Sequence, residues 1–197
     1  MTAPAEKDLS ATEPKGPGDR SKRRRRRRLW IVVGIMVLLF SAVTSRLFIW
    51  PDLPPLPDRA DAIIELGGPT IRDDAALALA RDHLAPVLVQ STREAESGTD
   101  SCLPPVTGVT IRCFYPVPDT TQGEARAIGA LAAQHHWDSV VLVTTPDHAW
   151  RARLWVSRCF PGNVYVSTTP LPFRYWFRQI PYQWVASAKA VLVHRSC

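Results

Sequence analysis

The sequence predicts an α/β domain with a mostly parallel sheet, preceded by one transmembrane helix. Between residues 60 and 197, short apolar and β-branched runs alternate with segments of helical spacing, which is typical of parallel sheets covered by helices. Near the N-terminus, residues 29–45 carry no charge and directly follow six arginines, Arg23 to Arg28. These observations divide the chain into an N-terminal membrane segment and one globular domain.

Residues 1–28 are expected to be a disordered basic tail, because they lack the apolar residues that would offset the entropy lost on ordering. Residues 29–50 are expected to form the transmembrane helix. Arg46 interrupts the apolar run near its end, where a long side chain can reach the headgroups, so the segment attains the roughly 20 residues that cross a bilayer. Trp30 and Trp50 lie at its two ends, as interfacial anchors do.

The arginine run favours a cytoplasmic N-terminus, because basic residues beside a membrane span stay on the cytoplasmic side. Residues 51–197 are then extracytoplasmic, and we expect a single-pass membrane protein. A cleaved signal peptide fits the same pattern, although the sequence shows no clean small-x-small cleavage site. The arginines could instead form a nucleic-acid or nuclear-targeting patch, but their position against the apolar span favours the topological role.

The charge of the globular part argues against a nucleic-acid partner. The chain has a net charge of +6, but residues 1–50 hold 11 of its 24 Lys and Arg residues and 4 of its 18 Asp and Glu residues. Residues 51–197 therefore hold 13 basic and 14 acidic residues, a balance of −1. A nucleic-acid-binding domain normally carries positive charge on its own surface. We expect the membrane and an anionic small molecule as partners, and no nucleic acid.

The elements of the domain follow a Pro-rich linker at residues 51–59. Strands are expected at 61–66, 87–90, 109–114, 139–144 and 163–168, and helices at 72–84, 121–136, 147–159 and 182–194. Since right-handed crossovers join parallel strands, these elements predict a Rossmann-like three-layer sandwich over residues 60–197. The turn after the first strand reads Gly67-Gly68-Pro69 rather than G-x-G-x-x-G, which is a weak dinucleotide signal, and the sequence assigns no cofactor.

The four cysteines suggest disulfides, because their number is even and the domain is expected outside the cytoplasm. Cys102 and Cys113 flank a short Pro-rich loop and are the pair we expect first. Cys159 ends a predicted helix and Cys197 ends the sequence. Four cysteines allow three pairings, so the connectivity stays open, and four unpaired thiols remain the alternative.

Residues 140–153, VVLVTTPDHAWRAR, are the most informative stretch. They predict a buried strand, a tight turn and a helix capped by Asp147. His148 and Arg151 are three residues apart and share one helical face in the first turn, where backbone N–H groups and the helix dipole favour an anion. Open α/β sheets bind ligands where strands end and helices begin, so we expect the functional site here.

Residues that follow the other strands are expected to gather at the same sheet edge. Glycines there let backbone N–H groups approach an anion, hydroxyls add donors, and the guanidinium groups suit a phosphate or carboxylate. The predicted ligand-binding residues are Gly67, Gly68, Arg72, Ser91, Thr121, Thr144, Thr145 and Arg151. The predicted catalytic residues are His148, which would move a proton, and Glu124, which would act as a general base.

Each of these predicted roles has a simpler structural interpretation. Arg151 could form an i, i+4 salt bridge with Asp147, as is common on helix surfaces. His148 could be a partly buried residue that caps its own turn. Thr120 or Thr121 would cap the helix that follows, and Glu124, three residues after Thr121, would complete a capping box there.

Other polar residues give weaker signals. Glu65 is unusual in an otherwise apolar strand, where a charge needs a partner or a cleft. His135 and His136 point about 100° apart on a helix and do not chelate easily together with Asp138, so we expect no metal site. The sequence contains no G-x-S-x-G motif, which disfavours acyl transfer by a nucleophilic serine.

Four segments occur in an order that is similar to a known family. They are DAIIELGG from Asp61, Arg72, TTQGEA from Thr120, and VTTPDHAWRA from Val143. Together they resemble the YdcF-like family, also called domain of unknown function 218, which includes the SanA and ElyC envelope proteins. The resemblance covers roughly residues 60–195. Its strongest motif has Thr145 where the family often has Ser and Asp147 where it has an aromatic residue.

The resemblance implies a Rossmann-like fold and, for membrane-anchored members, a role in envelope or cell-wall maintenance at the plasma membrane of a bacterium. It supplies no reaction. Together with the site residues, it supports the hypothesis of an envelope domain that binds a phosphate- or carboxylate-bearing ligand and acts on a lipid-linked cell-wall precursor. The alternative is a non-catalytic ligand-binding or scaffold protein of the envelope.

Overall fold

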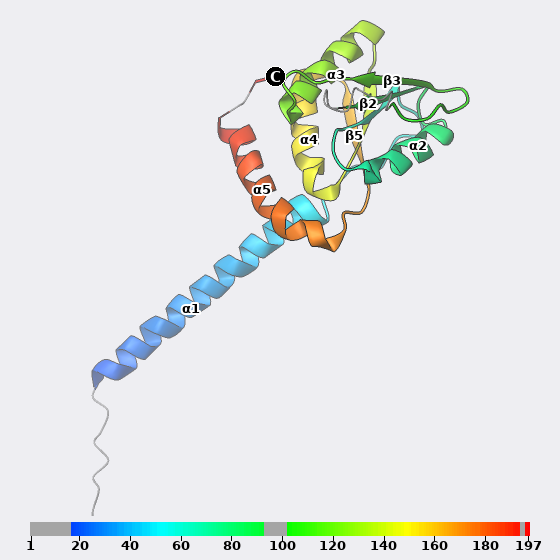
Figure 1. The fold of residues 1–197 in the computed structure, drawn as a ribbon. Helices are drawn as coiled ribbons and strands as arrows, with labels where there is room; N and C mark the ends of the chain where they lie inside the picture. Colours follow the sequence, from blue (N-terminus) through cyan, green and yellow to red (C-terminus); the bar gives the residue numbers. More distant parts are fainter. Residues whose placement is uncertain (1–16, 93–101, 194–195) are drawn as a thin grey trace, which may run out of the picture. The chain divides into compact units, whose positions relative to one another are not determined.

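The computed structural model describes residues 17–92, 102–193 and 196–197 of the chain. The chain divides into two units, residues 1–42 and residues 43–197, and each is described by itself. The first unit contains most of helix α1 (Pro17–Thr44; Figure 1). The second unit begins with the last two residues of α1, which a π-helical turn, η1 (Ser45–Ile49), follows. By length and composition, the segment Lys22–Ile49 is apolar enough to cross a membrane.

Helix α1 begins earlier than the sequence pattern predicts. Residues 17–28 are helical, so the expected disorder of the basic tail is wrong for this part; residues 1–16 lie outside the described residues. Lys and Arg have good helix propensity. Because the apolar span already provides a helical nucleus, the helix can extend backward without a new nucleation step.

The second unit contains a five-stranded sheet in which every pair of neighbouring strands is parallel, in the order β3-β2-β1-β4-β5. The strands are β1 (Ala62–Glu65), β2 (Val87–Ser91), β3 (Thr110–Phe114), β4 (Ser139–Thr144) and β5 (Asn163–Thr168). The helices are η2 (Thr70–Arg72), α2 (Asp73–Arg81), α3 (Thr121–His135), α4 (Pro146–Cys159) and α5 (Phe173–Leu192). The predicted α/β fold with a parallel sheet is therefore confirmed.

Successive residues of the central strands alternate between two separate cores, because side chains of a strand point to opposite faces of the sheet. Ile64 and Leu142 pack with residues of α3 and α4, whereas Ile63 and Val141 pack with residues of α2. This alternation produces the expected three layers, with the sheet between helices (Figure 1). The linker, residues 51–59, has no helix or strand, although Leu53 packs against the core on the α3 and α4 side.

The strand order places a reversal at the centre of the sheet. The chain moves from β1 outward to β2 and β3, and then returns to form β4 on the other side of β1. Open α/β sheets bind ligands at such a reversal, outside the carboxyl ends of the strands. The ends of β1 and β4 are therefore the first place to look for a site.

Helix α5 differs most from its predicted range. It begins at Phe173 rather than at residue 182, and Pro181 lies inside it. Proline removes one helical hydrogen bond and usually ends a helix. Here side-chain contacts outweigh that loss: Phe173 packs edge-to-face on Phe177, and the Trp184 indole packs edge-to-face on Phe48, with ring centroids 5.4 Å apart in both pairs.

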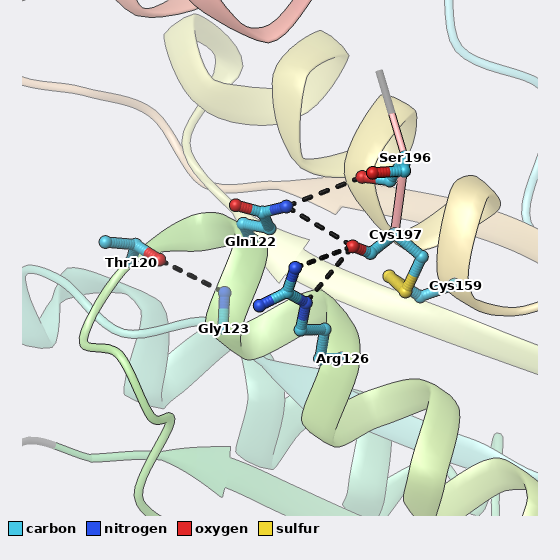
Figure 2. The surroundings of a disulfide bond; sticks show 7 residues. All are labelled: Thr120, Gln122, Gly123, Arg126, Cys159, Ser196 and Cys197. Carbon is cyan, nitrogen blue, oxygen red and sulfur yellow. Dashed lines mark hydrogen bonds between the residues drawn. A yellow bond between two sulfur atoms is a disulfide. The ribbon is translucent and has the colours of Figure 1, made fainter. Parts of the chain in front are cut away.

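Two disulfides join the described cysteines, Cys102 to Cys113 and Cys159 to Cys197. The first confirms the pair that was expected from the sequence. The second ties the end of α4 to a tail that also bonds the start of α3 (Figure 2). The Arg126 side chain donates hydrogen bonds of 3.1 and 2.8 Å to the Cys197 carbonyl oxygen, and the Gln122 amide donates one of 3.3 Å.

We expect loss of the Cys159–Cys197 disulfide to destabilise the domain more than loss of the Cys102–Cys113 disulfide. The cysteines are separated by 38 and 11 residues. Chain entropy alone then gives about 4 kcal/mol for the longer loop and about 3 kcal/mol for the shorter one. Denaturant unfolding of the Cys159→Ser/Cys197→Ser and Cys102→Ser/Cys113→Ser proteins measures both losses. A larger loss for the second protein would contradict the prediction.

Candidate functional site

A cavity of about 240 Å³ opens at the carboxyl edge of the sheet, where β1 and β4 end. The loop after β1, the first turns of α3 and α4, and the middle of α5 form its walls. Its lining residues are Gly67, Gly68, Pro69, Arg72, Asp119, Thr120, Thr121, Glu124, Asp147, His148, Arg151, Gln179, Tyr182 and Gln183. Seven of the ten residues predicted for the site are in this set, so the structure brings most of them together.

Arg151 is buried in the wall of the cavity, with 9% of its surface exposed. Its Nε donates to the Gln183 side-chain oxygen at 3.0 Å, and its Nη1 donates to the Thr121 hydroxyl at 2.8 Å. Its guanidinium also lies over the Tyr182 ring, 5.7 Å from the ring centre. These contacts hold the guanidinium in one orientation. The hydrogen bonds to Gln183 and Thr121 use two of its five N–H donors.

His148 lies between two hydroxyl groups and is almost completely buried. Its Nδ1 is 3.0 Å from the Thr144 hydroxyl and its Nε2 is 3.2 Å from the Thr121 hydroxyl. Burial holds the pKa of His148 well below its usual value, and the nearby positive charges of Arg151 and Arg72 lower it further. The imidazole is therefore neutral at physiological pH and has one donor and one acceptor nitrogen.

The Thr121 hydroxyl joins these two residues, because it contacts both Arg151 and His148. It lies in the first turn of α3 and lines the cavity. When His148 Nε2 accepts a hydrogen bond from the Thr121 hydroxyl, His148 is in the position of a base for that hydroxyl. Thr144, at the other ring nitrogen, then orients the base. This order of contacts allows proton transfer from the hydroxyl, although the low pKa of His148 makes the imidazole a weak base.

Arg72 lines the cavity, but most of its contacts are with the residues that form the cavity wall. Its Nη1 donates to the carbonyl oxygens of Leu66 and Gly67 at 2.9 and 2.7 Å, and its Nη2 donates to the Thr145 hydroxyl at 3.0 Å. Its Nε is buried and has no hydrogen-bond partner among the residues that the structure describes. The guanidinium thus ties the end of β1 to the end of β4, which limits its predicted role as a ligand contact.

The Arg72 guanidinium also explains the glycine at position 68. Gly68 has φ +153°, a conformation that residues with a side chain rarely adopt. A Cβ at this position would lie 2.6 Å from Nη1 of Arg72. Glycine is therefore required for the loop to close over the guanidinium.

Glu124 does not complete the capping box that the sequence suggests. The helix is capped by Thr120, whose side chain accepts from the Gly123 N–H at 3.1 Å. The Glu124 carboxyl instead accepts from the Gly67 N–H at 2.8 Å, across the cavity edge. Burial raises its pKa, while the Gly67 and Ser91 hydrogen bonds and the two arginines oppose the rise. The carboxyl therefore fixes the glycine turn, which competes with the predicted role as a general base.

Asp147 and Gln183 form a second layer of contacts that the sequence did not reveal. Asp147 is in the first turn of α4, but the residue before the helix is Thr145, so the predicted acidic cap is wrong. The i, i+4 salt bridge is also wrong: the Gln183 amide lies between the two groups and donates to Asp147 Oδ2 at 2.9 Å. The other oxygen, Oδ1, is buried and accepts no hydrogen bond from the described part of the chain.

Three predicted ligand-binding residues lie behind the cavity wall instead of in it. Thr144 contacts His148, Thr145 accepts from Arg72, and Ser91 is hydrogen-bonded to the Glu124 carboxyl. All three are buried at the ends of strands. They orient the side chains that line the cavity, so their predicted direct contact with a ligand is not supported by their position.

Glu65 belongs to a different cluster. It is buried on the α2 side of β1, where its carboxyl is hydrogen-bonded with Asp73 and with the Gln90 side chain. Burial and the neighbouring Asp73 carboxylate raise the pKa of Glu65 to about 8. Glu65 is therefore protonated over most of the physiological range and is outside the cavity.

The paired histidines have structural contacts. His135 Nε2 is 3.3 Å from Arg112 Nη1, and the His135 ring stacks on Trp137. His136 follows the last residue of α3 and has a left-handed backbone conformation. Within residues 17–92, 102–193 and 196–197, no group of three or more His, Cys, Asp and Glu side chains could hold a metal ion.

Comparison of the chain with protein-family models, with curated proteins and with solved structures gives no match. The chemistry of the cavity must therefore be judged on its own geometry. A volume of about 240 Å³ is smaller than the roughly 300–1,000 Å³ of most small-molecule pockets. The cavity suits the head of a ligand, such as a phosphate or carboxylate group, better than a whole dinucleotide.

We expect the Glu65→Gln protein to lose less stability than the unmodified protein as the pH rises from 5 to 8. The pKa of Glu65 is about 8 in the folded protein and 4.5 in the unfolded chain, so the folded protein binds more protons between pH 5 and 8. Folding stability from this group is complete below the lower pKa and is lost as the pH rises through the higher one. This group lowers the free energy of unfolding by at most about 1.4 kcal/mol for each pH unit.

Denaturant unfolding at several pH values measures this difference. Asp74→Asn is a matched control, since Asp74 is an exposed carboxylate beside Asp73 on the same helix. Parallel pH curves for the Glu65→Gln and unmodified proteins would show that Glu65 titrates normally.

Proposed function

We propose that the protein is a membrane-anchored extracytoplasmic domain of the bacterial envelope, related to the YdcF-like family. Its cavity binds a phosphate- or carboxylate-bearing ligand, and its reaction is on a lipid-linked cell-wall precursor. The observation that carries this proposal is the convergence of Arg151, Thr121 and His148 at the point where β1 and β4 end.

The helices around the cavity support an anionic ligand. The N-termini of α3 and α4 both border it, and helix N-termini carry partial positive charge and N–H groups that bind anions. Arg151 and Arg72 add two positive charges, and their effect on the pKa of His148 indicates a positive potential at the imidazole. Glu124 and Asp147 balance part of this charge, so the site favours a compact anion that contacts Arg151 directly.

Two buried polar atoms support a ligand with mixed hydrogen-bonding groups. Arg72 Nε is a donor and Asp147 Oδ1 is an acceptor, and neither has a partner among the described residues. Buried polar groups without partners are rare in folded proteins and often bind water or an ion. A phosphate ester with a neighbouring hydroxyl offers an acceptor and a donor together.

The cysteines and the N-terminal helix support the proposed compartment. Disulfides persist in oxidising environments and are rare in the cytoplasm, and all four cysteines of this chain are paired. The apolar segment Lys22–Ile49 provides an anchor, and the arginine run before it favours a cytoplasmic N-terminus. The disulfide-bonded domain would then lie in the extracytoplasmic space.

We expect Arg151→Lys to weaken binding of inorganic pyrophosphate by about 10- to 100-fold, because lysine keeps the charge but loses the planar fork of donors. This corresponds to about 1–3 kcal/mol for lost charge-assisted hydrogen bonds. Isothermal titration calorimetry measures the affinity. Arg153→Lys is the matched control, because Arg153 is exposed on the same helix. Equal affinities for the Arg151→Lys and control proteins would remove Arg151 from the ligand site.

The second candidate function is that of a non-catalytic binding or scaffold protein. The observation that favours it is the fixed position of His148, whose two ring nitrogens both have hydroxyl partners. A histidine held in this way can orient the Thr121 hydroxyl and the first turn of α3 without moving a proton.

The two functions differ in the effect of His148→Gln. If His148 moves a proton, this protein binds pyrophosphate with nearly unchanged affinity but fails to restore a strain that lacks the gene. If the domain only binds, binding and complementation change together. Calorimetry and complementation on the same variant therefore distinguish the two functions, and thermal unfolding confirms that the variant is folded.

A further inference from the structure

The first half of α5 has an exposed apolar face. Phe173 and Phe177 are 74% and 76% exposed, and they contact each other edge-to-face. With Trp176, Ile180 and Pro181 they form one wall of an apolar groove of about 580 Å³. Soluble domains rarely expose such a surface without a partner.

The other wall of the groove identifies what covers it. Ile49 and Trp50 line the groove together with α5. Ile49 is the last residue of the segment that is apolar enough to cross a membrane, and Trp50 follows it directly. Because these residues are covalently continuous with the span, a groove that includes them lies at the level where the span leaves the bilayer.

The apolar face of α5 also continues into contacts with the end of the span. Phe173, Phe177, Ile180 and Trp184 recur at helical spacing along one side of α5. Trp184 at the end of this stripe packs on Phe48, and its indole donates to the Thr44 hydroxyl at 3.1 Å. The stripe is therefore fixed against residues 44–48 at one end and exposed at the other.

The charge near this face fits an anionic surface. The sequence has no Asp or Glu after Asp147, whereas Arg174 and Arg178 are exposed on α5 beside the aromatic residues. Tryptophan and tyrosine with flanking basic residues are typical of segments at the lipid headgroups. Basic residues near an anionic leaflet are attracted to it.

We propose that the first half of α5, residues 173–181, lies in the lipid interface and contacts anionic phospholipid. This inference rests on the membrane anchoring proposed above, but it does not depend on the ligand of the cavity. Because Gln179, Tyr182 and Gln183 of the same helix line the cavity, this position of α5 places the cavity within reach of a lipid headgroup. An amphiphilic ligand can then reach the cavity without leaving the bilayer.

Photocrosslinking of the full chain in vesicles of phosphatidylcholine and phosphatidylglycerol tests the proposal. p-Benzoylphenylalanine replaces Phe177, and in separate proteins it replaces Leu38 or Tyr115. Leu38 is in the apolar span, and Tyr115 is an exposed residue after β3. We expect labelled phospholipid to be attached at positions 177 and 38 and not at position 115.

The other outcomes separate the two proposals. Lipid attachment at position 38 without attachment at 177 overturns the interfacial position of α5 and leaves the anchor intact. Attachment of a second copy of the chain at position 177 also overturns it and identifies the face as a dimer contact. No lipid attachment at position 38 overturns the anchor, and with it the interfacial position of α5.

A charge-matched pair of variants tests the preference for anionic lipid. Arg174→Gln/Arg178→Gln removes two charges beside the groove, and Arg153→Gln/Lys189→Gln removes two exposed charges elsewhere. We expect a several-fold loss of phosphatidylglycerol attachment at position 177 for the first protein only. Equal attachment in both proteins overturns the proposed attraction to anionic headgroups. Thermal unfolding verifies that both proteins are folded.

Discussion

The buried guanidinium of Arg72 is the interaction on which the site depends. It binds two carbonyl oxygens at the end of β1 and a hydroxyl at the end of β4, so one side chain fixes the two strands between which the chain reverses. Without it, two backbone carbonyl groups would lose their charged donor in a buried region, where unsatisfied polar groups are costly. The hydrogen bond from the Gly67 N–H to Glu124 then holds the loop after β1 against the first turn of α3.

The cavity is formed by paired polar groups that restrain each other, and few of them are free to adjust. Gln183 holds Asp147 and Arg151 apart, and Thr121 connects Arg151 to His148. In a site of this kind, the low dielectric strengthens each satisfied hydrogen bond and increases the cost of each missing one. A ligand that entered the cavity would therefore meet a preorganised set of donors, which would lower the entropy lost on binding.

The sequence predicted the parts that depend on local patterns. Alternating apolar strands and amphipathic helices indicate the parallel sheet, and the strand ends with their Gly and Thr residues indicate the edge at which the cavity lies. Contacts between distant segments could not be predicted: Glu124 bonds a loop 57 residues away, and Gln183 joins two residues of another helix. The early start of α5 was missed for the same reason, since Pro181 ends a helix by its local preference and only packing on Phe48 and its neighbours reverses it.

The Cys159–Cys197 disulfide turns residues 159–197 into a covalent ring. This ring contains β5 and α5, and the tail that closes it is bonded to α3. A single proteolytic cut between the two cysteines would leave both fragments attached, so the helix that carries Gln183 and Tyr182 would not be released from the domain. Such a ring lets the walls of the cavity survive a backbone break that would separate an unlinked chain.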